Sequence, residues 1–320
     1  MIDKALVETC YLAILGRRPE SAAVVEDKIA RLSSAAALVG ELLASPEFQD
    51  RTPGWVTDDY FHQAPRIDVA VPGALRQALF DRLRRQWGEL GRSEPFWSVL
   101  THDQYRTANL DAAAMARFYD TGAEHAALVE LFCSRNRAEI RRGICVELGC
   151  GVGRVTKHLA SRFETVIAID ISEGALRECR AMAEREGLAN IECRLLTAPD
   201  ELARLGRLDF FYSVITLQHS QPPVQAYILD ILLSKLKRGG GFLFQTQTYY
   251  PGYRFVAEEH LASAVETMDM HSLPMHEVLR RIAAHGHAIL EVTEDMWTGR
   301  RGSHTFFGQA RPRRSLRAML

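Results

Sequence analysis

Residues 144–154 read ICVELGCGVGR, an apolar run that passes into three alternate glycines. The run predicts a buried strand over 143–148, and the glycines predict a tight turn that leads into a helix over 154–163. Glycine permits left-handed dihedrals and a close approach of the backbone, while a helix start offers free N–H groups. This stretch therefore predicts a binding loop for a nucleotide-like cofactor.

Strands and helices alternate from residue 142 onward, which predicts a doubly wound, mostly parallel sheet. A helix is expected to begin at Pro222-Pro223 and to close at Gly239-Gly240-Gly241. The last two strands are joined by residues 294–303, which is too short for a crossover helix, so they should form an antiparallel hairpin. The predicted strands are 143–148, 165–169, 190–194, 208–214, 241–246, 287–293 and 304–310.

Two carboxylates help to identify the cofactor class. Asp170 ends the second predicted strand, near the offset of about 20 residues at which an acidic side chain meets ribose hydroxyls. The glycines run Gly-x-Gly-x-Gly, unlike the Gly-x-Gly-x-x-Gly of dinucleotide enzymes, which disfavours an NAD(P)-dependent oxidoreductase. Glu147 would repel a pyrophosphate but suits an ammonium or a sulfonium. A merely structural tight turn is the alternative, and the placement of Asp170 counts against it.

The stretch 147–153, together with AIDIS at 168–172, resembles the class I S-adenosylmethionine-dependent methyltransferases over about residues 142–313. The resemblance implies a Rossmann-like sheet of seven strands with an antiparallel C-terminal strand, and S-adenosylmethionine as the cofactor. The acidic residue that the family often places near adenine is missing around Leu196. The donor contacts that the resemblance implies are Glu147, Gly149, Gly151, Gly153, Asp170, Ile171, Leu196, Thr216, Leu217 and Tyr119.

The acceptor should lie beyond the fourth strand, because ligands bind at the carboxyl ends of strands in such sheets. Gln218 and His219 follow that strand, and His219 is the candidate general base for a hydroxyl acceptor. The alternative role for His219 is to bond the backbone and orient the loop. Further candidates for binding the acceptor are His271 and Tyr250.

The stretch MDMHSLPMH at 268–276 precedes a predicted helix over 276–284. Asp269 with His271 and His276 could hold a divalent metal or the acceptor. We favour a loop whose methionines pack and whose histidines are partly exposed, so no metal site is predicted.

The first part of the chain predicts a separate helical module with helices near 5–15, 22–32 and 35–44. Tyr11, LGRRPE at 15–20 and SPEF at 45–48 resemble the small helical domain found beside glycosyltransferases and methyltransferases in bacterial surface-polysaccharide proteins. A simple helical cap is the alternative. The expected domains are 1–62 for this module and its linker, 63–141 for a helical lid or appendage with helices near 73–87 and 111–135, 142–313 for the Rossmann-like domain, and 314–320 for a tail.

The composition limits the partners and the compartment. The 320 residues carry 39 basic and 40 acidic side chains and a net charge of -1, which gives no general attraction to nucleic acid. No apolar run suggests a signal peptide or membrane insertion, and the six cysteines form no Cys-x-x-Cys pair. We expect a cytoplasmic protein with reduced thiols.

The sequence therefore predicts an S-adenosylmethionine-dependent methyltransferase that methylates a hydroxyl of a sugar, a glycan or another small molecule. The glycan preference rests on the two resemblances alone. The alternatives are a noncatalytic S-adenosylmethionine-binding or interaction module and an oxidoreductase. The expected partners are a small-molecule or glycan acceptor, a second copy of the chain in a homodimer, and polysaccharide-assembly proteins.

Overall fold

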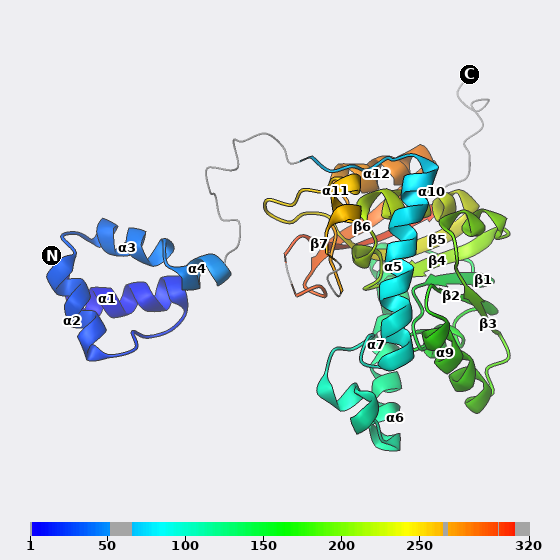
Figure 1. Ribbon diagram of the computed structural model, residues 1–320, viewed down its shortest axis with the longest axis horizontal. Coiled ribbons are helices and arrows are strands. Elements are labelled where there is room, and N and C mark those ends of the chain that lie inside the picture. Colours follow the sequence, from blue (N-terminus) through cyan, green and yellow to red (C-terminus); the bar gives the residue numbers. More distant parts are fainter. Residues whose placement is uncertain (1, 52–65, 265–267, 300, 311–320) are drawn as a thin grey trace. The chain divides into compact units, whose positions relative to one another are not determined.

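The computed structural model describes residues 2–51, 66–264, 268–299 and 301–310 (Figure 1). The chain divides into two compact units, Met1–Ala64 and Pro65–Leu320. The predicted tail at 314–320 and most of the linker predicted before residue 66 lie outside the described residues.

The first unit is a small bundle of short helices around one apolar cluster. Its core includes Val7, Leu15 and Leu38, each at most 2% exposed. Arg17 ties two ends of the bundle together, because its Nε donates to Glu47 Oε1 at 2.8 Å while its guanidinium lies over the ring of Tyr11. The helices are α1 (Lys4–Cys10), the π-helical turn η1 (Tyr11–Leu15), α2 (Ala22–Arg31), α3 (Ala35–Leu43) and α4 (Pro46–Arg51).

The three predicted helices of this unit are confirmed, and α4 is an addition to them. The predicted helix near 35–44 stops before Ser45-Pro46, and no helix is predicted after it. In the structure Ser45 Oγ accepts a hydrogen bond from the Phe48 N–H at 3.2 Å, and Pro46 occupies the first helical position. A serine cap followed by proline is a start signal as well as a stop signal, so this helix was detectable from the sequence.

The second unit contains one seven-stranded sheet in the order β3-β2-β1-β4-β5-β7-β6. The first five strands pair in parallel, and β7 pairs antiparallel with both β5 and β6, which confirms the predicted terminal hairpin. The strands are β1 (Ile144–Leu148), β2 (Thr165–Asp170), β3 (Ile191–Leu195), β4 (Leu208–Ser213), β5 (Leu236–Gln247), β6 (His287–Asp295) and β7 (Ser303–Ala310).

Both faces of the sheet are covered, and β4 shows how one strand serves two cores. Every residue of β4 is buried. Successive side chains of a strand point to opposite faces. Phe211 therefore joins the cluster that includes α10 (Pro222–Lys235), while Phe210 and Tyr212 join the cluster that includes α7 (Gly122–Asn136). An apolar run without polar alternation is the expected signature of a strand buried on both sides.

Helices flank this sheet, and α5 crosses one side of the unit, with contacts to α9, α10 and α11 (Figure 1). α5 also brings residues that precede the sheet next to the ends of its strands. The helices are α5 (Gly73–Ser93), α6 (Ala112–Asp120), α7 (Gly122–Asn136), α8 (Thr156–Leu159), α9 (Glu173–Arg185), α10 (Pro222–Lys235), α11 (Ala257–Ala262) and α12 (Met275–Ala284).

Two helix predictions need correction. The predicted helix over 111–135 is divided into α6 and α7 at Thr121, and Gly122 packs so tightly on the Arg154 carbonyl that a side chain there would overlap it. The predicted helix over 154–163 is reduced to α8, which spans one turn, with turns on either side. The break at Thr121 comes with tight tertiary packing at Gly122, which local periodicity does not report.

The glycine triplet also behaves differently from the prediction. α10 begins at Pro222 as expected but ends at Lys235, and the triplet lies inside β5. The pairing of β5 with β4 shifts register between Leu208 and Phe210, and Gly239 has φ +76°. The triplet therefore permits an irregularity in the strand rather than ending a helix.

None of the helices in the described part of the chain combines the length and the apolar character needed to cross a bilayer.

Candidate functional site

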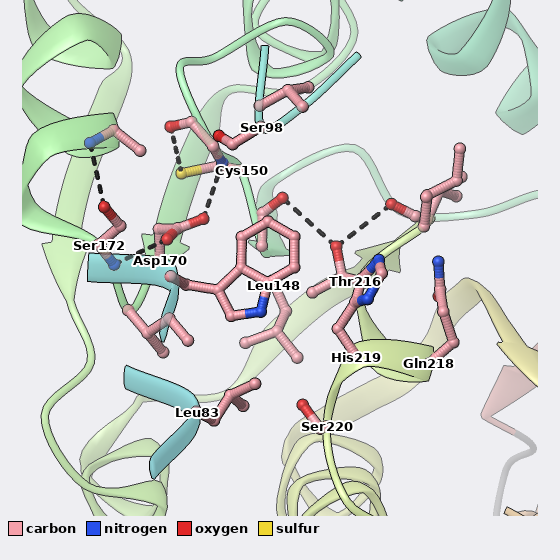
Figure 2. Close-up of a pocket in the computed structure, with 18 of the residues that line it drawn as sticks. Leu83, Ser98, Leu148, Cys150, Asp170, Ser172, Thr216, Gln218, His219 and Ser220 are labelled. Carbon is pink, nitrogen blue, oxygen red and sulfur yellow. Dashed lines mark hydrogen bonds between the residues drawn. The ribbon is translucent and has the colours of Figure 1, made fainter. Parts of the chain in front are cut away.

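The sheet places its switch point between β1 and β4, where the direction of winding reverses. Ligands of doubly wound sheets bind outside the carboxyl ends of the strands at this point. A cavity of about 360 Å³ lies there, bordered by residues that follow β1, β2 and β4. Figure 2 shows Asp170 and Ser172 on one side of it and Thr216, Gln218 and His219 on the other.

The glycine-rich loop forms one wall of this cavity. Gly149, Gly151 and Gly153 have φ of +76°, +55° and +87°, values that a residue with a Cβ rarely adopts. The loop is tied to the neighbouring strand, because the N–H groups of Gly149 and Cys150 both donate to the Ile169 carbonyl, at 2.7 and 3.1 Å. The loop therefore presents backbone to the cavity in a conformation that requires glycine.

Asp170 holds the same loop from the end of β2. One carboxylate oxygen accepts the Gly151 N–H at 2.8 Å, and the other accepts the Ser172 N–H at 2.8 Å. Burial raises the pKa of Asp170, and these donated hydrogen bonds oppose the rise. A carboxylate offers about four lone-pair positions, so Asp170 keeps acceptor capacity for a ligand in the cavity that it borders.

Glu147 is the second carboxylate of the site and is only 3% exposed. Burial raises its pKa to about 7, against the hydrogen bond that Thr156 Oγ1 donates to it at 2.6 Å and the nearby Arg154 cation. Arg154 is also buried, and its Nη1 donates to the Thr121 carbonyl at 3.1 Å. Glu147 is thus poised to change charge near neutral pH at the edge of the cavity.

His219 borders the other end of the cavity, in the turn η6 (Leu217–His219) that follows β4. Its Nδ1 lies 3.1 Å from the Asp269 main-chain oxygen, and its ring packs edge-on against Trp87 with centroids 4.8 Å apart. Burial lowers its pKa to about 4, although the hydrogen bond to Asp269 raises it. His219 is therefore neutral at pH 7.

Gln218 lies beside His219 at this end of the cavity and is 1% exposed. Neither its amide nitrogen nor its amide oxygen has a hydrogen-bond partner among the described residues. A buried amide without partners is costly unless a ligand or water satisfies it. Gln218 therefore offers one donor and one acceptor group to an occupant of the cavity.

Ile215 is a residue of this site that the sequence analysis did not single out. It borders the cavity just after β4 and has φ +54°, which is unusual for a β-branched side chain. Its N–H donates to Gln245 Oε1 at 2.8 Å, which holds the strained conformation. Backbone strain of this kind gathers at functional sites.

Much of the cavity wall comes from the region 63–141, which was expected to be a lid or appendage and from which only Tyr119 was proposed as a contact. The helix α5 and the segment after it are far from β1 in sequence, and only their packing reveals the contribution. These additional lining residues are Phe80, Leu83, Trp87, Gly91, Ser98, Val99 and Thr101. The segment 268–270 and the β6–β7 connection add Met268, Met270, Trp297 and Thr298.

Nine of the residues proposed from the sequence border this one cavity. They come from separate strand ends, and the fold brings them together. They are Glu147, Gly149, Gly151, Asp170, Ile171, Leu196, Thr216, Gln218 and His219.

Three of the proposed donor contacts lie away from the cavity wall. Tyr119 is 2% exposed and packs on Phe96, with its hydroxyl donating to the Val152 carbonyl behind the glycine loop. Gly153 packs against α9, where a Cβ would lie 2.8 Å from Cys179 Sγ. Leu217 is fully buried in the apolar core. The structure therefore places Tyr119, Gly153 and Leu217 outside the set of residues that border the cavity.

Two of the proposed acceptor contacts also lie outside the cavity wall. His271 is 5% exposed, its N–H donates to the Gln218 carbonyl at 2.6 Å, and its Nδ1 lies 2.9 Å from the Tyr253 hydroxyl. Tyr250 is 36% exposed and does not border the cavity. The chain turns between residues 268 and 271, so Met268 and Met270 face the cavity while His271 does not.

Residues 145–240 match the family model described as Methyltransferase domain. A segment of 103 residues is 33% identical to ubiquinone biosynthesis O-methyltransferase from Acinetobacter baylyi, covering 32% of this chain and 42% of that protein. Another segment of 101 residues is 33% identical to probable cobalt-precorrin-6B C(15)-methyltransferase (decarboxylating) from Methanothermobacter thermautotrophicus. The match covers 31% of this chain and 50% of that protein. The chain thus spans about half the length of these curated relatives.

Among solved structures, magnesium protoporphyrin IX methyltransferase from Synechocystis, with bound SAH, superposes with a TM-score of 0.48 and 15% identity. The superposition covers 72% of this chain and 100% of that chain.

Proposed function

We propose that this protein, whose residues 145–240 are a methyltransferase domain with S-adenosylmethionine as its cofactor, methylates a hydroxyl group of a sugar, a glycan or another small molecule. One observation carries the proposal. A single cavity joins the glycine loop and Asp170 at one end to Gln218 and His219 at the other. A methyl donor and a polar acceptor could therefore meet inside it.

The donor end fits S-adenosylmethionine by its chemistry. The left-handed glycines remove side chains where the cofactor approaches the backbone, and Asp170 keeps lone pairs for ribose hydroxyls. Glu147 supplies a carboxylate near the cationic part of the cofactor. We assign Gly149, Gly151 and Asp170 to binding the cofactor, with Ile171, Leu196 and Thr216 completing the wall. The cofactor supplies an electrophilic methyl group when it is bound.

The acceptor end positions a hydroxyl and receives its proton. His219 donates through Nδ1 to a carbonyl, which can only accept, so Nε2 keeps its lone pair. We assign Nε2 of His219 to accept the hydrogen of the acceptor hydroxyl as its oxygen is methylated. Gln218 orients the acceptor through its unpartnered amide. Holding the two reactants in line is the main contribution that such a site makes to the rate.

A sugar-like acceptor is supported by the mixture of groups that border the cavity. Trp87 and Trp297 offer aromatic faces, while Gln218, Ser220 and Thr298 offer hydrogen-bonding groups. Aromatic rings combined with a few placed polar groups suit a compact molecule that has both apolar and hydroxylated faces. A small planar phenol fits the same description, so the acceptor screen includes both classes.

The roles proposed for the rest of the chain rest on the sequence. We propose that the first unit serves association with polysaccharide-assembly proteins or with a second copy of the chain. The residues that carry the resemblance, Tyr11, Arg17 and Glu47, are brought together in that unit. We propose a cytoplasmic location, which is consistent with six free cysteines.

Calorimetric titration of the full chain tests the donor assignment. S-adenosylhomocysteine should bind with a stoichiometry of one, and NADH and NADPH should not bind. Asp170→Asn should weaken S-adenosylhomocysteine binding by at least about tenfold, equivalent to about 1.4 kcal/mol, whereas Asp200→Asn, whose side chain is 67% exposed, should not. Binding of a nicotinamide dinucleotide alone would overturn the proposal.

A screen of sugars and phenols with S-adenosylmethionine, followed by release of S-adenosylhomocysteine, tests the reaction. Turnover with a hydroxyl compound supports the proposed acceptor. If the cofactor binds but no acceptor in either class is methylated, the proposed acceptor is refuted, and a noncatalytic S-adenosylmethionine-binding module becomes the favoured alternative.

A further inference from the structure

Three side chains behind the acceptor end form a cluster that the proposed reaction does not use. His260 lies on α11, and Asp269 and His271 lie on the segment before α12. One ligand atom from each residue lies within 4.8 Å of the others. Two imidazoles and a carboxylate are a ligand set that first-row divalent metals accept.

His271 shows the feature expected of a metal ligand. Its ring is 5% exposed, and Nε2 has no hydrogen-bond partner among the described residues. The other ring nitrogen lies 2.9 Å from the Tyr253 hydroxyl, which fixes the ring orientation. Histidines that bind metals through one nitrogen commonly use the second in this way. The orphaned Nε2 is therefore an independent sign that a ligand belongs at this cluster.

His260 completes the pair of imidazoles. Its ring lies 5.1 Å from that of His271, centroid to centroid, in an edge-on arrangement. Gln221 Nε2 lies 3.3 Å from His260 Nε2, and Gln221 Oε1 is buried without a hydrogen-bond partner in the described part of the chain. Rotation of the Gln221 side-chain amide by half a turn would exchange its nitrogen and its oxygen, so that Oε1 would lie beside His260 Nε2. Gln221 is thus available as a fourth ligand.

The cluster combines two imidazoles with one carboxylate, near the positive charge of Arg82. Burial lowers the pKa of His260 to about 4 and that of His271 to about 3, with a smaller effect of Arg82 on both. Both rings are neutral at pH 7, so their lone pairs are available. The Arg82 guanidinium donates to the carbonyls of Ser263 and Ala264, at 3.0 and 2.6 Å, and so is already occupied by the chain beside α11.

We propose that His260, Asp269 and His271 bind one divalent transition-metal ion of the Zn²⁺ type. The ion would join α11 to the segment 268–271. The flanking residues Met268 and Met270 border the cavity, and the Asp269 carbonyl bonds His219. A metal here would hold the acceptor wall in place without contacting the donor. The inference does not depend on the proposed methyl transfer.

Titration of the chelator-treated full chain with Co²⁺ tests the site, because Co²⁺ bound to nitrogen and oxygen ligands gives visible absorption bands. We expect one Co²⁺ per chain, displaced by Zn²⁺, and a higher midpoint of thermal unfolding with Zn²⁺ present. His260→Asn and Asp269→Asn should each weaken binding by about 10- to 100-fold or more. His276→Asn is the matched control, since that side chain is 78% exposed and lies outside the cluster.

Three results would overturn the inference. They are a dissociation constant for Co²⁺ above about 1 mM, unchanged binding in both cluster variants, and equal weakening in the His276→Asn control. If His260→Asn does not fold, Asp269→Asn decides, because it preserves side-chain shape. X-ray absorption of the wild-type Co²⁺ complex is independent of any variant: scattering from two imidazoles supports the site, and the absence of imidazole scattering refutes it.

Discussion

The His219 Nδ1 atom lies 3.1 Å from the main-chain oxygen of Asp269, which links the turn after β4 to the segment before α12. Because a carbonyl only accepts, this contact makes Nδ1 the donor and leaves the lone pair on Nε2. The same two segments are joined again where the His271 N–H donates to the Gln218 carbonyl at 2.6 Å. Two hydrogen bonds to main-chain oxygens thus join these segments, and the one from the His219 ring also sets the histidine tautomer.

His219 should make stability depend on pH between about 6.5 and 4. Its pKa is lowered to about 4 in the folded chain, so the unfolded chain binds the proton first as the pH falls. The stabilising effect of the neutral ring is therefore present above pH 6.5 and is lost as the pH falls towards 4. Between pH 7 and pH 5 this loss should be about 1–2 kcal/mol in the free energy of unfolding.

Urea unfolding of the wild-type chain and of His219→Asn, at both pH values, checks this expectation. In His219→Asn, the free energy of unfolding should change less between the two pH values, by the amount that His219 contributes. The exposed control His276→Asn should behave as the wild type does. An identical pH dependence in all three proteins would mean that His219 is not buried as a neutral ring.

Gln218 and Gln225 provide a comparison between an unpartnered and a partnered buried amide. Gln225 Nε2 donates to the Ser220 carbonyl at 2.6 Å, and its Oε1 accepts from Thr246 at 2.8 Å, whereas neither amide atom of Gln218 is bonded within the described residues. Gln225→Leu should lower the free energy of unfolding by about 1–3 kcal/mol. Gln218→Leu removes a buried amide that has no partner among the described residues, so it should not lower the free energy of unfolding, and it should raise the KM for the acceptor.

Denaturant unfolding and steady-state kinetics measure these effects. Similar destabilisation by the two substitutions would show that Gln218 is already satisfied inside the protein. An unchanged KM for the acceptor in Gln218→Leu would remove Gln218 from the acceptor site.

Gly151 should be needed for binding and not only for the turn. Gly151→Ala places a Cβ at φ +55°, 2.8 Å from Val99 Cγ2 beside the cavity. Gly187→Ala imposes similar strain at φ +66° but meets no atom within 4 Å. Both variants should lose about 1–2 kcal/mol of stability.

The two glycine variants should differ in affinity. Calorimetry should show S-adenosylhomocysteine binding at least about tenfold weaker for Gly151→Ala and unchanged for Gly187→Ala. If Gly151→Ala and Gly187→Ala bound S-adenosylhomocysteine with equal affinity, the cofactor would not approach the loop at Gly151.

Glu147 should couple cofactor binding to protonation. Its pKa is raised to about 7, so the carboxyl is mainly protonated at pH 6 and ionised at pH 8. A cationic ligand favours the ionised form, so affinity for S-adenosylmethionine should rise over this interval, by up to about tenfold per pH unit below the pKa. Glu147→Gln should remove that part of the pH dependence.

Calorimetry at pH 6, 7 and 8 measures the effect, with Glu192→Gln as the control because that side chain is 53% exposed. If the affinity of the wild type for S-adenosylmethionine fell with rising pH, and that of Glu147→Gln did not, the ionised carboxylate would oppose binding and the prediction would be contradicted.

The amino-acid sequence determined the sheet and predicted many of the residues that border the cavity. The run 208–214 predicted the fourth strand, and the short 294–303 connection predicted the terminal hairpin, and the structure has both. The spacing of the glycines and Asp170 predicted residues that the structure brings to one cavity, because each lies at the end of a neighbouring parallel strand. These features depend on local pattern and short-range spacing, which a sequence carries directly.

Tertiary packing decided the remainder. Trp87 joins the cavity because α5 crosses that side of the unit, and Tyr119 lies behind the glycine loop because α6 packs there. His271 faces away from the cavity and towards His260, a residue that the sequence never paired with it. Which face of a loop meets a cavity depends on contacts between segments distant in the chain, and no local periodicity encodes that choice.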